Sequence, residues 1–167
     1  MKTLLIPVDH SESSEQLIHA AISHFPDMPL ELVLVHPYSL PSKPTELVRK
    51  ALTHCLDQKS LVLLNRLKDN IKDRYPVYPS IRVRTYCQFG SAQQVIEDHA
   101  RAVCPDFIVM AEPRRSGIWS KLNPPLAVRL ISRVEVPILT LPLRSLHRAA
   151  ERLVLATRAI PMHPNSN

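Results

Sequence analysis

Glycine is scarce in this sequence, with two residues in 167, Gly90 and Gly117. Phosphate-binding loops usually need several glycines, because the backbone must come close to the ligand. The chain contains no GxxxxGK(S/T) motif, and it contains no GxSxG or HExxH motif. These absences argue against a P-loop nucleotide site, an α/β-hydrolase nucleophile and a zinc protease site.

Cysteines and long apolar runs are also few. Cys55, Cys87 and Cys104 are an odd number of thiols without CxxC spacing, which argues against disulfides and favours buried structural thiols. The eight histidines are scattered singly, so no metal site is predicted. No apolar run approaches the roughly 20 residues that a membrane-spanning helix needs. The N-terminal segment is typical of a first strand rather than a signal peptide, so we expect a cytoplasmic protein without a membrane segment.

Positive charge is concentrated late in the chain. Residues 1–100 hold 11 Lys and Arg and 11 Asp and Glu, whereas residues 101–167 hold 10 and 4, which accounts for the net charge of +6. Such a segment can bind phosphates, nucleic acid or an acidic partner, or it can be a solvated surface. Its only aromatic residues are Phe107 and Trp119, which gives nucleic-acid binding little support.

Apolar periodicity predicts strands that alternate with helices. The strands are expected at 3–8, 30–36, 81–87, 107–110 and 136–141, and the helices at about 12–25, 45–73, 91–103 and 124–133. This order predicts one α/β domain over residues 1–143, with an open, five-stranded, mainly parallel, Rossmann-like sheet and helices on both faces. The alternating segment 81–87 is typical of a half-buried strand or an edge strand. Residues 144–167 are expected to form a C-terminal extension, either a helix whose apolar stripe docks onto the domain or onto another subunit, or a frayed tail.

Serines mark two of the predicted helix starts. Ser11 is a good N-cap, and Ser91 has capping-box spacing with Gln94. In the helix after Ser91, His99 lies on the inner face, and we interpret it as a packing residue rather than a ligand.

Two segments are expected at the carboxyl edge of the sheet, where open α/β sheets bind ligands. They follow the first and fourth strands and read PVDHS and MAEPRRSGIW. In the first segment, Asp9 is placed either to accept hydrogen bonds from a ligand or to cap the next helix. In the second segment, Arg114 and Arg115 carry charge that can attract an anion.

Four segments of the chain resemble the universal stress protein family. They are LLIPVDHSESSEQLIHAAI, VRTYCQFGSAQQVIEDHA, PDFIVMAEPRRSG and VEVPILTLP, which occur in the family's order within residues 2–142. The resemblance implies an open α/β sheet, a role in the stress response and a homodimer that pairs through the last strand, 136–141.

One branch of that family binds ATP through a loop of the form G-x-x-G, nine residues, then G-S/T. The corresponding positions here are Ala111, Arg114, Pro124 and Pro125. None keeps the family residue, although Asp9 and Met110 match the family pattern. With Asn123 as the N-cap, the two prolines would occupy the first two helical positions and remove two N–H donors that a phosphate could use.

We therefore expect a dimeric regulatory or protein-binding module of the stress response that has no enzymatic activity and binds no ATP. The alternative is a nucleotide-binding stress protein for ATP or ADP, with Asp9, Met110 and Arg114 in an atypical site. Weak nucleic-acid binding through the basic segment is a third interpretation.

Overall fold

The computed structural model describes residues 1–9, 11–39, 46–76, 80–112 and 125–143, with only the backbone described for 46–54. The elements are β1 (Lys2–Pro7), α1 (Glu12–His24), β2 (Leu30–Tyr38), α2 (Glu46–Arg74), β3 (Ile81–Phe89), α3 (Ala92–Val103), β4 (Phe107–Ala111), α5 (Leu126–Ile131) and β5 (Ile138–Leu141). The predicted strands and helices are confirmed, and their ends differ from the expected positions by no more than about two residues.

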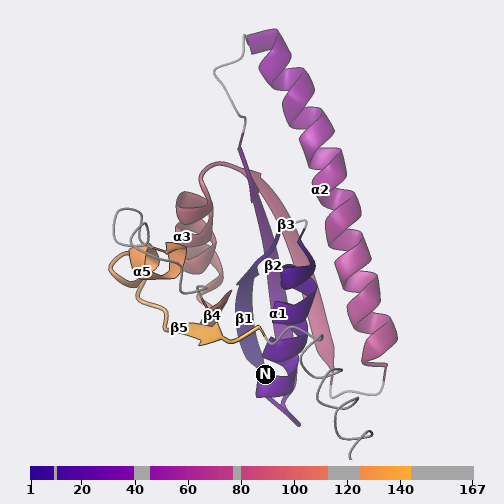
Figure 1. The fold of residues 1–167 in the computed structure, drawn as a ribbon, viewed down its shortest axis with the longest axis vertical. Helices are drawn as coiled ribbons and strands as arrows, with labels where there is room; N and C mark the ends of the chain where they lie inside the picture. The colour runs from indigo at the N-terminus through magenta and orange to yellow at the C-terminus, as the bar shows by residue number, and fades with distance from the viewer. Residues whose placement is uncertain (10, 40–45, 77–79, 113–124, 144–167) are drawn as a thin grey trace, which may run out of the picture.

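The strands form one five-stranded sheet in the order β3-β2-β1-β4-β5 (Figure 1), and every neighbouring pair is parallel. This arrangement confirms the predicted Rossmann-like fold. The chain runs outward from β1 through β2 to β3, and then returns to place β4 on the other side of β1. The switch point, where a ligand site is expected, therefore lies between β1 and β4.

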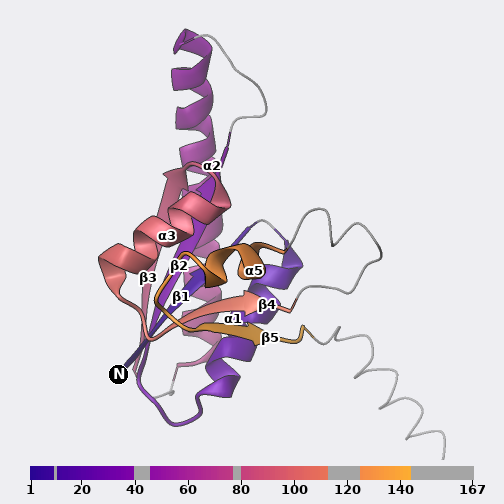
Figure 2. The same cartoon turned by 90° about the vertical axis from the view of Figure 1, so that its left-hand side faces the viewer.

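Helices cover both faces of the sheet (Figures 1 and 2). On β1, Leu4 and Ile6 belong to a core cluster with α1 and α2, whereas Leu5 belongs to a cluster with α3 and α5. All three side chains are fully buried, and burial of each contributes about 1.5–3 kcal/mol. Strands that are buried on both faces read as continuous apolar runs, which explains the run at the start of the sequence.

The two edge strands of the sheet, β3 and β5, differ in length. β3 has nine residues and pairs with β2 along its whole length, whereas β5 has four residues. Along β3, Arg82, Arg84 and Tyr86 alternate with less exposed residues that face α2, so the predicted edge strand is confirmed. None of the described helices is long and apolar enough to span a bilayer.

The prediction of buried thiols is wrong for two of the three cysteines. Cys55 and Cys104 are exposed, and Cys87 is half-buried against the cluster beneath α2. Cys104 is the C-cap of α3, where its left-handed backbone (φ 47°) ends the helix at the surface. Cys55 lies on the outer side of α2, opposite the buried residues Leu64, Leu67 and Ile71.

Candidate functional site

Asp9 closes the turn between β1 and α1. Its Oδ1 accepts hydrogen bonds from the backbone N–H of Ser11 (2.9 Å), from the Ser11 hydroxyl and from Ser14 Oγ (2.8 Å). The backbone N–H of Asp9 in turn donates to Ser14 Oγ (2.8 Å). Ser11 occupies the N-cap position as predicted, but its side chain makes no cap hydrogen bond to the helix. In this turn the Ser11 hydroxyl is therefore bound to Asp9 and not to the first turn of the helix.

These contacts keep Asp9 charged. Burial alone would raise the pKa of Asp9, but the hydrogen bonds from Ser11 and Ser14, with a smaller effect of His36, bring the pKa below its ordinary value. The carboxylate is therefore ionised at neutral pH. Among the described residues, no hydrogen bond ends on its second oxygen, Oδ2, which keeps the capacity to accept from a ligand.

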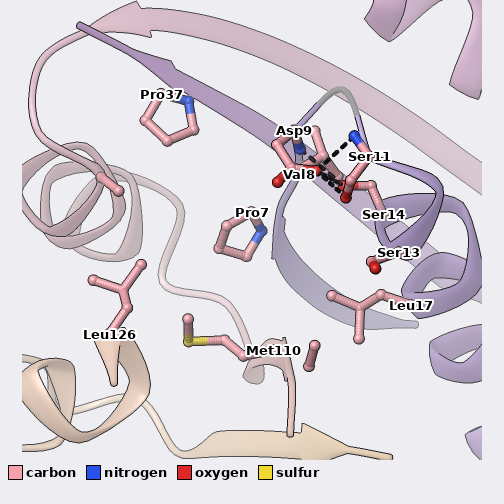
Figure 3. A pocket seen from close by; sticks show the side chains of 12 residues that line it. Pro7, Val8, Asp9, Ser11, Ser13, Ser14, Leu17, Pro37, Met110 and Leu126 are labelled. Carbon is pink, nitrogen blue, oxygen red and sulfur yellow. Dashed lines mark hydrogen bonds between the residues drawn. The ribbon is translucent and has the colours of Figure 1, made fainter. Parts of the chain in front are cut away.

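A cavity of about 280 Å³ lies at the carboxyl edge of the sheet, beside the switch point (Figure 3). Its polar side comes from the β1–α1 turn and includes Asp9 and Ser13. Its apolar side includes Pro37 from the end of β2, Met110 from β4 and Leu126 from the start of α5. Figure 3 shows Asp9 and the serines across the cavity from Met110 and Leu126. The volume is close to the lower limit of ordinary small-molecule sites.

The cavity is suited to binding rather than to acid–base catalysis. Among the described residues that line it, Asp9 alone is ionisable, and its lowered pKa makes it a poor proton donor or acceptor near pH 7. Within the part of the chain that the structure describes, no group of His, Cys, Asp and Glu side chains is placed to hold a metal ion.

The structure brings together two of the predicted site residues, Asp9 and Met110. Arg114 and Arg115 lie outside the described residues. Pro37 and Leu126 were missed by the sequence analysis, although both lie at the carboxyl edge that identified Asp9.

The predicted start of α5 is wrong. Pro125 is the N-cap, with an extended backbone (φ −51°, ψ 149°), and the helix begins at Leu126. A proline disfavours helical backbone in the residue before it, which opposes a helix that starts with two prolines. Because Pro125 precedes the helix, it removes no N–H from the first helical turn, and the expected loss of two donors does not follow. The other two candidates, Asn123 and Pro124, lie outside the described residues.

His99 is confirmed as a packing residue. Its Nδ1 lies 2.9 Å from the carbonyl oxygen of Val95, and its ring lies 5.1 Å from that of Tyr86 between ring centres. The imidazole is thus held between α3 and β3, and it is not among the residues that line the cavity.

Comparison with known proteins identifies a matching family and several similar solved structures. A family model described as the universal stress protein family matches residues 1–142. No match was found among curated proteins. The chain is similar to the solved structure of the universal stress protein UspA from Lactobacillus plantarum, with 14% identity, a TM-score of 0.66, and coverage of 84% of this chain and 97% of the other.

Two similar structures contain a nucleotide. A universal stress protein family protein from Arabidopsis thaliana with AMP bound has 16% identity and a TM-score of 0.59, and the match covers 88% of this chain and 95% of the other. A universal stress protein in complex with cAMP has 17% identity and a TM-score of 0.55, with coverage of 86% and 98%. At these identities the likeness establishes the shared fold.

Proposed function

The chain belongs to the universal stress protein family, and we propose that it is a dimeric regulatory module whose cavity takes a nucleoside or nucleoside monophosphate rather than ATP. The observation that carries this proposal is the cavity at the switch point, with an ionised Asp9 on one side and Met110 and Leu126 on the other. No enzymatic activity is included, because the described lining of the cavity contains no pair of groups for acid–base chemistry.

The two sides of the cavity fit the two parts of a nucleoside. The apolar side, with Met110 and Leu126, offers contacts to the faces and edges of a base. Oδ2 of Asp9 is available to accept a hydrogen bond from a ribose hydroxyl, the usual partner of an acidic residue at this edge of a Rossmann-like sheet. AMP and cAMP in two similar structures agree with a ligand of this class.

A triphosphate is a poorer fit on the evidence of the sequence. ATP-binding relatives have glycine at the positions of Ala111, Arg114 and Pro124, and serine or threonine at the position of Pro125. Each carries a side chain or ring where the backbone would have to approach the β- and γ-phosphates. The corrected start of α5 does not change this argument. The start of the helix determines which N–H groups are available, whereas the argument here depends on the missing glycines.

Calorimetric titration of the purified protein with AMP, ADP and ATP tests the proposal. AMP is expected to bind most tightly, and Asp9→Ala is expected to weaken AMP binding by roughly tenfold or more. The matched control is Asp106→Ala, which removes the same charge at the opposite edge of the sheet, where Asp106 accepts from the N–H of Thr3. This control should leave AMP affinity unchanged.

Two results would count against the nucleotide assignment. Tighter binding of ATP than of AMP would show that a triphosphate is accommodated without the glycines. If none of the three nucleotides bound, the result would favour the protein-binding module that the sequence analysis expects.

The dimer part of the proposal rests on β5. This strand is an edge of the sheet, and no other described strand pairs with its outer side, so its outer backbone groups can pair with the same strand of a second copy. Native mass spectrometry should show two subunits, and Thr140→Pro, at an exposed position of β5, should shift the mass to one subunit while circular dichroism remains unchanged. A wild-type protein that is monomeric in the same measurement would contradict it.

A further inference from the structure

A second surface, away from the cavity, lies along the free edge of β3. This strand pairs with β2 from Ile81 to Phe89, and none of the described strands pairs with its other side. Figure 1 shows β3 at the margin of the sheet, with α2 running beside it. Every second residue of such a strand presents its N–H and C=O groups outward, where they can pair with an added strand.

One side of this edge is basic and aromatic. Arg82, Arg84 and Tyr86 project from β3 on the face opposite α2, and all three are exposed. Arg84 forms an ion pair with Glu31 (3.0 Å), whereas Arg82 has no ion-pair partner among the described residues. The charge of Arg82 therefore lies close to the backbone groups of the edge.

The other side of the edge is formed by one flank of α2. The residues of α2 that face the core are Leu64, Leu67 and Ile71. Asn70 faces α1, because its Nδ2 lies 3.4 Å from Glu15 Oε1. With 3.6 residues per turn, Leu61, Lys68 and Lys72 lie on the flank away from α1, which is the flank beside β3. Leu61 is 49% exposed.

We propose that this surface, formed by the edge of β3 with Lys68, Lys72, Arg82, Arg84 and Tyr86, binds an extended acidic segment of a partner protein as a sixth strand. Backbone pairing would supply a direction and a register. The cations on both flanks would select carboxylates on both faces of the added strand, since successive side chains of a strand point to opposite faces.

Charge excludes two other occupants. In a second copy paired through β3, Arg82 and Arg84 would lie close to the same arginines, and like charges across a strand pair are destabilising. The C-terminal segment 144–167 contains four arginines and one glutamate, so it is repelled as well. An acidic partner is the occupant that matches the surface.

The test uses a synthetic peptide of nine residues, the length of β3, with two glutamates on each face of the extended chain and threonine at the other positions. In NMR titrations, its addition should shift the amide resonances of residues 81–89. The same peptide with alternate amides N-methylated should not bind, because it lacks the main-chain donors that strand pairing needs. Arg82→Glu and Lys68→Glu should each weaken binding roughly fivefold.

Arg66→Glu is the matched control for Lys68→Glu. It makes the same change of charge two residues away, on the outer and exposed side of α2, and should leave the affinity unchanged. Four outcomes would overturn the proposal: no binding of the peptide, equal weakening by the control, undiminished binding of the N-methylated peptide, or tighter binding of a nine-residue oligothymidylate at the same resonances. The last outcome would assign the surface to single-stranded nucleic acid.

Discussion

Two turns at the carboxyl edge of the sheet connect a strand to a helix by different chemistry. Both helices begin with an extended serine, Ser11 before α1 and Ser91 before α3. Oγ of Ser91 accepts from the N–H of Gln94 (3.3 Å), which is half of the predicted capping box. The Ser11 hydroxyl instead donates to Asp9. The same residue type at the same position thus caps one helix and supports a carboxylate in the other turn.

The backbone differs in the same way. The β3–α3 turn depends on Gly90, whose φ of 150° is strained for other residues, and whose N–H donates to the carbonyl of Tyr38 (2.9 Å). The β1–α1 turn depends on the side-chain hydrogen bonds of Asp9 and Ser14. A turn that is stabilised by its backbone needs no side chain in a binding site. In the turn at Asp9, the side chains that stabilise the turn also line the cavity.

The largest effect on stability is expected from Gly90→Ala. A methyl group there would meet Val95 Cγ2 at 3.0 Å, and the backbone would be held in a conformation that alanine disfavours. The free energy of unfolding, measured by urea denaturation, should fall by about 2–3 kcal/mol. Because most of this loss is backbone strain, adding Val95→Ala should not restore it. Recovery in the double variant would show that the clash was the main cause.

Asp9→Ala should have the next largest effect, a loss of about 1–2 kcal/mol of unfolding free energy, because three donors from Ser11 and Ser14 lose their acceptor. Ser14 exchanges hydrogen bonds with Asp9 in both directions. The losses from Asp9→Ala and Ser14→Ala should therefore be less than additive in the double variant. Strict additivity would show that the two residues act independently and that the turn is not held as one unit.

This contrast also explains how far the sequence analysis could reach. The strands and helices were predictable, because buried apolar runs and helical periodicity depend on neighbours in the chain. The place of Asp9 followed from the same logic, since it comes directly after the first strand. That Asp9 would accept from Ser11 and Ser14 was left open, because capping and ligand binding require the same residue type at the same position.

Other features depend on contacts between distant segments, which no local pattern contains. Pro37 and Leu126 line one cavity with Met110 only because β2 and β4 end, and α5 begins, at one edge of the sheet. The start of α5 was misplaced because proline is favoured at a first helical position in general, whereas two in succession restrict one another. Cys55 is exposed because it lies on the side of α2 that faces away from the sheet, and the usual burial of cysteine does not predict this.

The two cap serines should differ in a direct comparison. Ser91→Ala removes an N-cap hydrogen bond to Gln94 and should reduce the free energy of unfolding by about 1 kcal/mol. Ser11→Ala removes one of three hydrogen bonds to Asp9, and the remaining two keep the turn closed, so the loss should stay below about 0.5 kcal/mol. Equal losses in urea denaturation would mean that both serines act as ordinary caps and that the contrast between the two turns does not hold.

The smallest expected effect is on the loss of unfolding free energy as the pH falls, which is called the acid limb of the stability curve below. The pKa of Asp9 in the folded protein is below its ordinary value of 3.8, so its contribution to stability is complete above that value and is lost as the pH falls through the folded-state pKa. Because the side chain is largely exposed, solvent screens the effect and keeps it small. Between about pH 5 and about pH 2, Asp9→Asn should therefore lose less unfolding free energy than the wild type.

The pKa of Asp106 is also lowered, mainly by the hydrogen bond from the N–H of Thr3, so Asp106→Asn should flatten the same limb of the curve. AMP affinity distinguishes the two variants. Asp9→Asn should change both the AMP affinity and the stability in acid, whereas Asp106→Asn should change only the stability in acid. If Asp9→Asn ran parallel to the wild type in acid, the hydrogen bonds from Ser11 and Ser14 would not favour the ionised carboxylate. The turn would then be held by its backbone, as the turn at Gly90 is.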